Sequence, residues 1–250
     1  MPSQLIVIKS AAKAGADIIK FQTYKAEKIA CKISPYYWDI KKIPVKSWSS
    51  KEIFNFKPRI STFFYLCFGL TLFGFGEALL VVSTTGNSPW TVLAEGVSII
   101  ADISIGVATF FISIAVLSLW FFLKQKPGLG TIMNIIIIAI VLDITISSIN
   151  PPSLIISQYF TAVLGVFLVG LGSGFYLTAN LGPGPRDGLM TSLTKRTNLP
   201  IALVRGCIEV SAVAVGWYLG GNVGIGTLIY AFGIGPCVAL GLFIVDKIFN

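Results

Sequence analysis

Six long apolar stretches follow one another along residues 60 to 245, separated by short connections that contain Gly, Pro or charged residues. None of the stretches holds more than two charged residues. At 1.5 Å per residue, about twenty helical residues cross the roughly 30 Å of hydrocarbon in a bilayer. The pattern therefore predicts six membrane-spanning helices, at residues 60–83, 103–123, 129–149, 155–179, 200–219 and 225–245.

Two shorter amphipathic segments interrupt this series, at residues 88–101 and 184–197. They begin with Ser88-Pro89 and Gly184-Pro185, and proline suits the first turn of a helix because no hydrogen bond is lost there. Both segments are too short to cross a bilayer. We expect two short helices, one after the first span and one after the fourth.

The composition makes lipid the main solvent of this chain. Hydrophobic residues make up 54 % of it and charged residues 12 %, and the mean hydropathy is +0.82. A water-soluble domain of 250 residues could not hide this much apolar surface in one core. The four cysteines lack C-x-x-C spacing and histidine is absent, so we expect neither a metal site nor a cofactor.

The net charge of +8 lies entirely in the first 59 residues, which hold twelve of the nineteen Lys and Arg and four of the eleven Asp and Glu. A basic head next to an apolar body determines topology and attracts anionic lipid headgroups, so a nucleic-acid surface is disfavoured. Within the head, residues 41–59 form a basic juxtamembrane linker. This linker either lies on the inner membrane surface or forms a disordered tether.

The remaining Lys and Arg predict the orientation of the spans, because cytoplasmic connections concentrate positive charge. With the head inside, Lys and Arg occur in the inner connections and at the C-terminal end, whereas the outer connections at 84–102, 150–154 and 220–224 contain neither. We expect a multi-pass protein of the bacterial inner membrane with both termini in the cytoplasm.

The chain also repeats itself at an offset of 96 residues, without gaps. The offset divides the body into repeat A, residues 60–149, and repeat B, residues 150–250. Each repeat has three spans, so the second copy must be inverted relative to the first, an architecture that recurs in secondary transporters. Duplication of this kind also occurs in proteins that transport nothing. The matched residue pairs are Gly69 and Gly165, Gly74 and Gly170, Gly76 and Gly172, Gly86 and Gly182, Pro89 and Pro185, and Leu93 and Leu189.

The two loops that precede the short helices are the first candidate site. Free backbone N–H groups and the positive end of the helix dipole attract anions at a helix N-terminus. If the short helices dip into the membrane, Ser88, Pro89, Gly184 and Pro185 would lie near the solute pathway, and Arg186 would add positive charge. Surface turns that lead into interfacial helices are the alternative.

Charged residues inside spans are the second candidate, because they are costly there. Glu209 lies about 13 Å into its helix, near the midplane, which makes it the first choice for a solute or proton site. Arg205 is one turn away on the same face, so a structural ion pair is the alternative. Glu77 and Asn134 are further candidates for solute binding.

The body resembles the YczE/YitT-type family of bacterial inner-membrane proteins over residues 60–247. This resemblance implies a multi-spanning membrane protein and leaves its substrate open. The residues that carry it are Ser88-Pro89-Trp90-Thr91-Val92-Leu93, Lys126-Pro127-Gly128-Leu129-Gly130-Thr131, Gly182-Pro183-Gly184-Pro185-Arg186-Asp187-Gly188, Arg205 with Glu209, and Gly224-Ile225-Gly226-Thr227.

The head resembles the sialic acid (N-acetylneuraminate) synthase family over residues 4–40, which include Lys20-Phe21-Gln22-Thr23. This resemblance implies a short partial α/β segment in residues 1–40. It also implies that Lys20 and Gln22 match residues that line the family's catalytic site. That chemistry needs a whole barrel, which one helix and one strand cannot close. We expect a fragment without catalysis, so that Lys20 and Gln22 are vestigial and the chain is not an enzyme.

These observations favour a permease for a small, anionic solute. The alternative is a membrane scaffold or regulator that carries no solute, and synthase activity is a third possibility for the head only. Membrane lipid is the expected partner, with anionic headgroups near the basic linker, and a homo-oligomer is compatible with the sequence.

Overall fold

The computed structural model describes residue 56 and residues 58–249. The synthase-like head and nearly all of the basic linker lie outside these residues, and so do Lys20 and Gln22. The described part of the chain contains eight helices and no strand. They are α5 (Ile60–Ser83), α6 (Pro89–Ala101), α7 (Ile105–Leu123), α8 (Leu129–Ser148), α9 (Ile155–Thr178), α10 (Pro185–Thr197), α11 (Ile201–Tyr218) and α12 (Ile225–Phe249).

Six of these helices are long and apolar enough to cross a membrane, namely α5, α7, α8, α9, α11 and α12. The six predicted spans and the two short helices are therefore confirmed as helices. The ends follow local signals. Proline occupies the first position of α6 and of α10, where its missing N–H costs nothing. Left-handed residues at Thr84, Asp102, Lys124 and Asn198 end α5, α6, α7 and α10.

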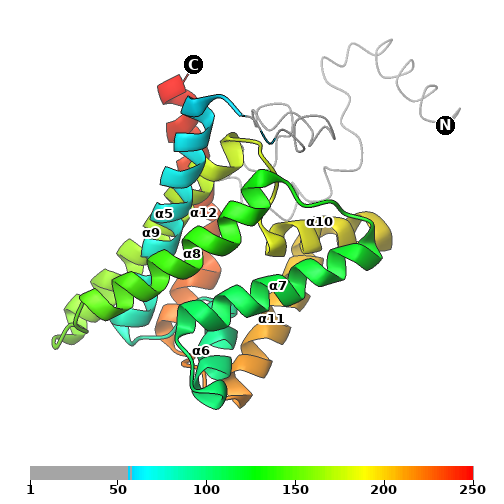
Figure 1. Ribbon diagram of the computed structural model, residues 1–250. Coiled ribbons are helices and arrows are strands. Elements are labelled where there is room, and N and C mark those ends of the chain that lie inside the picture. Colours follow the sequence, from blue (N-terminus) through cyan, green and yellow to red (C-terminus); the bar gives the residue numbers. More distant parts are fainter. Residues whose placement is uncertain (1–55, 57, 250) are drawn as a thin grey trace, which may run out of the picture.

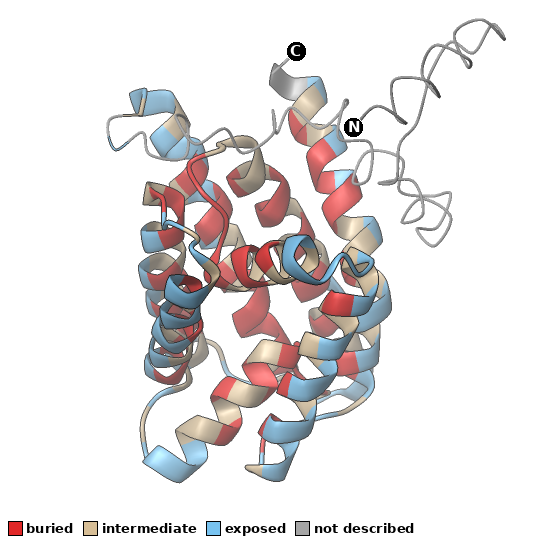
Figure 2. Cartoon of the chain, turned by 90° about the vertical axis from the view of Figure 1, so that its right-hand side faces the viewer, coloured by how far each residue is buried: buried red, intermediate tan, exposed pale blue. Residues whose placement is uncertain are grey.

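The helices form two groups (Figure 1). In the first group α5 packs against α8 and α9, and α9 packs against α12. In the second group α6 packs against α7 and α11, while α10 packs against α7 and α11. Large apolar side chains such as Phe121, Ile156 and Phe232 are more than 80 % exposed, and exposed residues line the outer helix faces in Figure 2. Such an apolar exterior suits a protein surrounded by lipid.

Glycine lets α5 and α9 approach closely. A Cβ atom added to Gly76 would lie 2.6 Å from the carbonyl oxygen of Gly165, and one added to Gly69 would lie 2.8 Å from that of Gly172. Small residues allow this kind of backbone contact between membrane helices. These glycines are therefore needed for helix packing because there is no room for a side chain between the two backbones.

Several contacts occur twice, once between two residues and once between the two residues that the 96-residue repeat makes equivalent to them. The amide of Gly130 donates to the carbonyl of Leu181 over 2.7 Å, and the amide of Gly226 donates to that of Thr85 over 2.9 Å. Adding 96 to the number of Gly130 gives Gly226, and subtracting 96 from the number of Leu181 gives Thr85, so the second hydrogen bond joins the positions equivalent to the first. The two glycine contacts between α5 and α9 are related by the same exchange.

Candidate functional site

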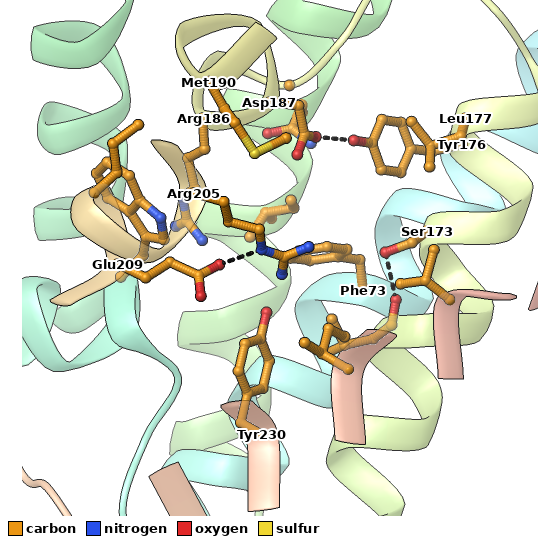
Figure 3. Close-up of a pocket in the computed structure, with 18 residues that line it drawn as sticks. Phe73, Ser173, Tyr176, Leu177, Arg186, Asp187, Met190, Arg205, Glu209 and Tyr230 are labelled. Carbon is orange, nitrogen blue, oxygen red and sulfur yellow. Dashed lines mark hydrogen bonds and ion pairs between the residues drawn. The ribbon is translucent and has the colours of Figure 1, made fainter. Parts of the chain in front are cut away.

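A cavity of about 90 Å³ lies between the two helix groups. It is lined by residues of α5, α6, α8, α9, α10, α11 and α12 and by the residue that precedes α10. Figure 3 shows several polar side chains that surround it. The polar residues of the lining are Asn134, Ser173, Tyr176, Arg186, Asp187, Arg205, Glu209 and Tyr230.

Arg205 and Glu209 form an ion pair on α11, with 2.7 Å between Nε and Oε1. The predicted i, i+4 pair is thus present, and both of its members line the cavity. Their side chains are only 26 % and 23 % exposed. The hydroxyl of Tyr230 points toward this pair from α12 (Figure 3). A structural ion pair and a solute site are therefore compatible here.

Arg186 differs from Arg205, because it forms no ion pair with any carboxylate of the described residues. Its guanidinium lies 5.2 Å from the centre of the Trp90 ring, a cation–π contact between α10 and α6. Both residues line the cavity. They are also 96 residues apart in the sequence, so the first turns of the two short helices meet at this point.

The first turn of α10 also supplies Asp187, whose Oδ2 accepts a hydrogen bond from the hydroxyl of Tyr176 on α9. Gly184, the residue before α10, lines the cavity beside Asn134: a Cβ atom added to it would lie 3.0 Å from Nδ2 of Asn134. The loop and the start of α10 thus form one wall of the cavity, and α8 and α9 contribute to the facing part.

Five predicted site residues therefore line one cavity: Arg186, Arg205, Glu209, Asn134 and Gly184. The other four do not line it. Pro185 is buried and its carbonyl accepts from Nε1 of Trp120 over 3.1 Å. Pro89 is buried at the start of α6. Glu77 and Ser88 bind each other in a separate cluster.

That cluster joins α5 to the start of α6. Oε2 of Glu77 accepts hydrogen bonds from the hydroxyls of Ser88 and Thr91, each over 2.6 Å. Glu77 and Ser88 are each 1 % exposed. The loops at 86–89 and 182–185 are buried throughout, so their backbone lies inside the fold rather than on its surface.

Sequence reasoning missed Trp90, Ser173, Tyr176, Asp187 and Tyr230. The 96-residue offset could have indicated three of them, because it pairs Trp90 with Arg186, Ser173 with Glu77, and Tyr230 with Asn134. Asp187 was next to a predicted residue. Ser173 and Tyr176 lie in an apolar helix where nothing in the local sequence distinguishes them from packing residues.

Six long apolar helices, five of which line a partly polar cavity, with apolar side chains on the outside, define a multi-pass helical membrane protein. The chain belongs to a family of unknown function (DUF6198), whose model matches residues 60–242.

Three bacterial proteins are similar to this chain. A Haemophilus influenzae protein described as uncharacterized is 40 % identical over 209 residues, which cover 84 % of this chain and 95 % of that protein. The uncharacterized membrane protein YczE of Bacillus subtilis is 31 % identical over 68 % of this chain and 79 % of its own length. The uncharacterized protein YyaS of the same organism is 26 % identical over 67 % of this chain and 85 % of its own length. The predicted YczE-type resemblance is thereby confirmed.

The model of the NeuB family matches residues 7–58. This match confirms the predicted resemblance of the head to a sialic acid synthase, in a part of the chain that lies almost wholly outside the described residues. No solved structure matches the chain.

Proposed function

We propose that this protein is a permease of the bacterial inner membrane for a small solute with an anionic group. The observation that carries the proposal is Arg186, a cation without a carboxylate partner among the described residues, in a cavity between the two helix groups. A charged side chain at membrane depth is costly and most often marks a pathway or site. An anionic group of the solute would supply the missing partner.

The size of the cavity limits the solute. Sites for drug-sized ligands measure several hundred cubic ångströms, whereas this cavity measures about 90 Å³. A solute of only a few non-hydrogen atoms fits this space. Asp187 and Glu209 also line the cavity, so a zwitterion that carries an amino group beside its anionic group is compatible with it.

The same proposal includes two inverted three-helix repeats, residues 60–149 and 150–250. Two observations support them: the hydrogen bonds and glycine contacts that occur twice with exchanged partners, and the contact of Trp90 with Arg186 across the cavity. In this mechanism the short helices α6 and α10 act as re-entrant half-helices. Their N-terminal ends face the solute, and the two repeats expose it alternately to either side.

The test is uptake into vesicles that contain the purified full-length protein, at two pH values. The panel contains inorganic phosphate, acetate, lactate and glycine. For the solute that is taken up, Arg186→Ala should lower the rate about tenfold or more, the effect of losing one hydrogen bond to a charged group. The matched control is Arg196→Ala, which removes an exposed arginine from the same helix and should stay within about twofold.

Equal rates for the Arg186→Ala and Arg196→Ala proteins would exclude Arg186 from the pathway. A scaffold or regulator would instead be supported if the wild-type protein took up none of the solutes and if substitution of Arg186 or Glu209 abolished the binding of a partner. We propose further that the synthase-like head does not catalyse. Purified full-length protein that condensed phosphoenolpyruvate with N-acetylmannosamine would contradict this part of the proposal.

A further inference from the structure

We propose that Glu77 is the centre of a second site, which binds a monovalent cation, either a proton or Na⁺. Its role as the coupling ion of transport rests on the function proposed above. The site itself does not, because binding can be measured without transport.

The first argument is the missing counter-charge. Glu77 is 1 % exposed and forms no ion pair with a Lys or Arg of the described residues. No Lys or Arg occurs anywhere between residues 60 and 123. A bare carboxylate is very unfavourable in such surroundings and is normally paired or neutralised. A bound cation would neutralise it.

The second argument is the set of oxygen atoms at the cluster. Oε2 of Glu77 accepts from the hydroxyls of Ser88 and Thr91, but its Oε1 is buried and has no hydrogen-bond partner. Oδ1 of Asn87, the residue before Ser88, is also buried without a partner. Buried acceptors that lack a donor are rare and need an explanation. A Na⁺ ion bound by Oε1 would supply one, whereas a proton would neutralise the charge of the carboxylate.

The charge of the cluster selects a monovalent ion. Within the described part of the chain, Glu77 is the carboxylate that accepts hydrogen bonds from Ser88 and Thr91. The described residues contain no group of three or more His, Cys, Asp and Glu that could hold a metal ion. Divalent cations usually require more carboxylates than this. One unit of negative charge is matched by one proton or one Na⁺.

Three other carboxylates, on α6, α8 and α11, already have partners. α7 and α9 carry no Asp, Glu, Lys or Arg. Tyr230 lies on α12, at the cavity. The three carboxylates are Glu95 on α6, which accepts from Asn87 and Asn222, Asp143 on α8, which accepts from Ser104 and the amide of Gly106, and Glu209 on α11, which pairs with Arg205. Among the described residues, Glu77 is the carboxylate that has a buried oxygen without a hydrogen-bond partner.

The cation site shares two helices with the solute cavity. Phe73 lies one turn before Glu77 on α5, and Trp90 lies between Ser88 and Thr91 at the start of α6. Both Phe73 and Trp90 line the cavity, and the Trp90 ring covers Arg186. Loss of the cation would change the hydrogen bonds that hold the first turn of α6, and thus the position of Trp90 over Arg186. Cation and solute would therefore influence each other's affinity.

The experiment uses the purified full-length protein and two direct readouts of binding. For Na⁺, thermal unfolding is followed in NaCl and in choline chloride at equal ionic strength. At a Na⁺ concentration a hundred times its Kd, the Tm should rise by about 5 to 10 °C. For a proton, infrared difference spectra should contain the carbonyl band of a protonated carboxyl group at neutral pH. Glu77→Gln should abolish whichever signal the wild-type protein gives.

Asp143→Asn is the matched control, because Asp143 is another carboxylate within a span but has its own donors. It should retain the signal. If Glu77→Gln does not fold, Ser88→Ala keeps the carboxylate and removes one hydroxyl; it should weaken Na⁺ binding about tenfold or shift the infrared band. The proposal would be overturned if the wild-type protein gave neither signal. It would also be overturned if the signal survived in the Glu77→Gln protein. Absence of uptake, in contrast, would overturn only the proposed function.

Discussion

Single glycine residues set the distance between α5 and α9. A Cβ atom at Gly76 would meet backbone atoms, with the carbonyl oxygen of Gly165 at 2.6 Å and the amide nitrogen of Val169 at 2.8 Å. Backbone cannot move aside as a flexible side-chain end can. Space at this crossing, rather than backbone conformation, therefore requires glycine.

We expect Gly76→Ala to destabilise the protein by about 1–3 kcal/mol, because the added methyl group must separate two packed helices. Thermal unfolding in detergent measures the effect. Gly206→Ala is the matched control, since a Cβ atom there meets nothing within 4 Å. Alanine also has the higher helix propensity, so the control should be neutral or slightly stabilising. An equal loss of Tm in both variants would contradict the close-packing explanation.

At the scale of residues, sequence reasoning identified charged groups more readily than their partners. Arg205, Asn134 and Glu209 were predicted because polar and charged residues are conspicuous in apolar helices, and Arg186 because it adds positive charge at the start of a short helix; all four line one cavity. The hydroxyl partners of Glu77 come from eleven and fourteen residues away on another helix. Such contacts depend on how α6 folds back on α5, which hydropathy does not report.

At the scale of elements, the two short helices are held by buried loops that resemble each other. The amide of Asn87 donates to the carbonyl of Asn222, and the amide of Asn222 donates to Glu95 on α6. These bonds satisfy the backbone N–H groups of both asparagines. The bounds of the helices could be predicted from the prolines and from the lengths of the apolar stretches. The hydrogen bond from Asn222 to Glu95 joins residues 127 positions apart, and no local sequence signal predicts it.

The burial of the first loop can be tested with cysteine labelling in a cysteine-free background. Ser88 is 1 % exposed, whereas Thr84, at the end of α5, is exposed. We expect a water-soluble maleimide to label Thr84→Cys at least tenfold faster than Ser88→Cys, because the reagent reaches only exposed thiolates. Similar rates at both positions would indicate that the start of α6 is open to water, as expected for a surface turn.

At the scale of the whole molecule, the two repeats have different chemistry on a similar framework. The step of 96 residues pairs Glu77 with Ser173 and Thr91 with Asp187. In repeat A the carboxylate lies on the long helix α5 and the hydroxyl on the short helix α6, while in repeat B the serine is on α9 and the carboxylate on α10. Trp90 and Arg186, which the same step pairs, meet at the cavity. The sequence shows these exchanged side chains but not which of them come into contact; among the described residues, neither Arg186 nor Glu77 forms an ion pair.

The proposed inverted arrangement makes a prediction that concerns the molecule as a whole. Three spans in each repeat place the two ends of the body on the same side of the membrane, and the distribution of Lys and Arg favours the cytoplasmic side. A fluorescent reporter fused after Asn250 should therefore fluoresce in the cytoplasm. Alkaline phosphatase inserted at residues 220–224 should be active outside, whereas the same enzyme inserted next to Lys124 should be inactive. Because one span more or fewer would reverse every later connection, a reporter at Asn250 located outside would contradict both the orientation and the inverted repeat.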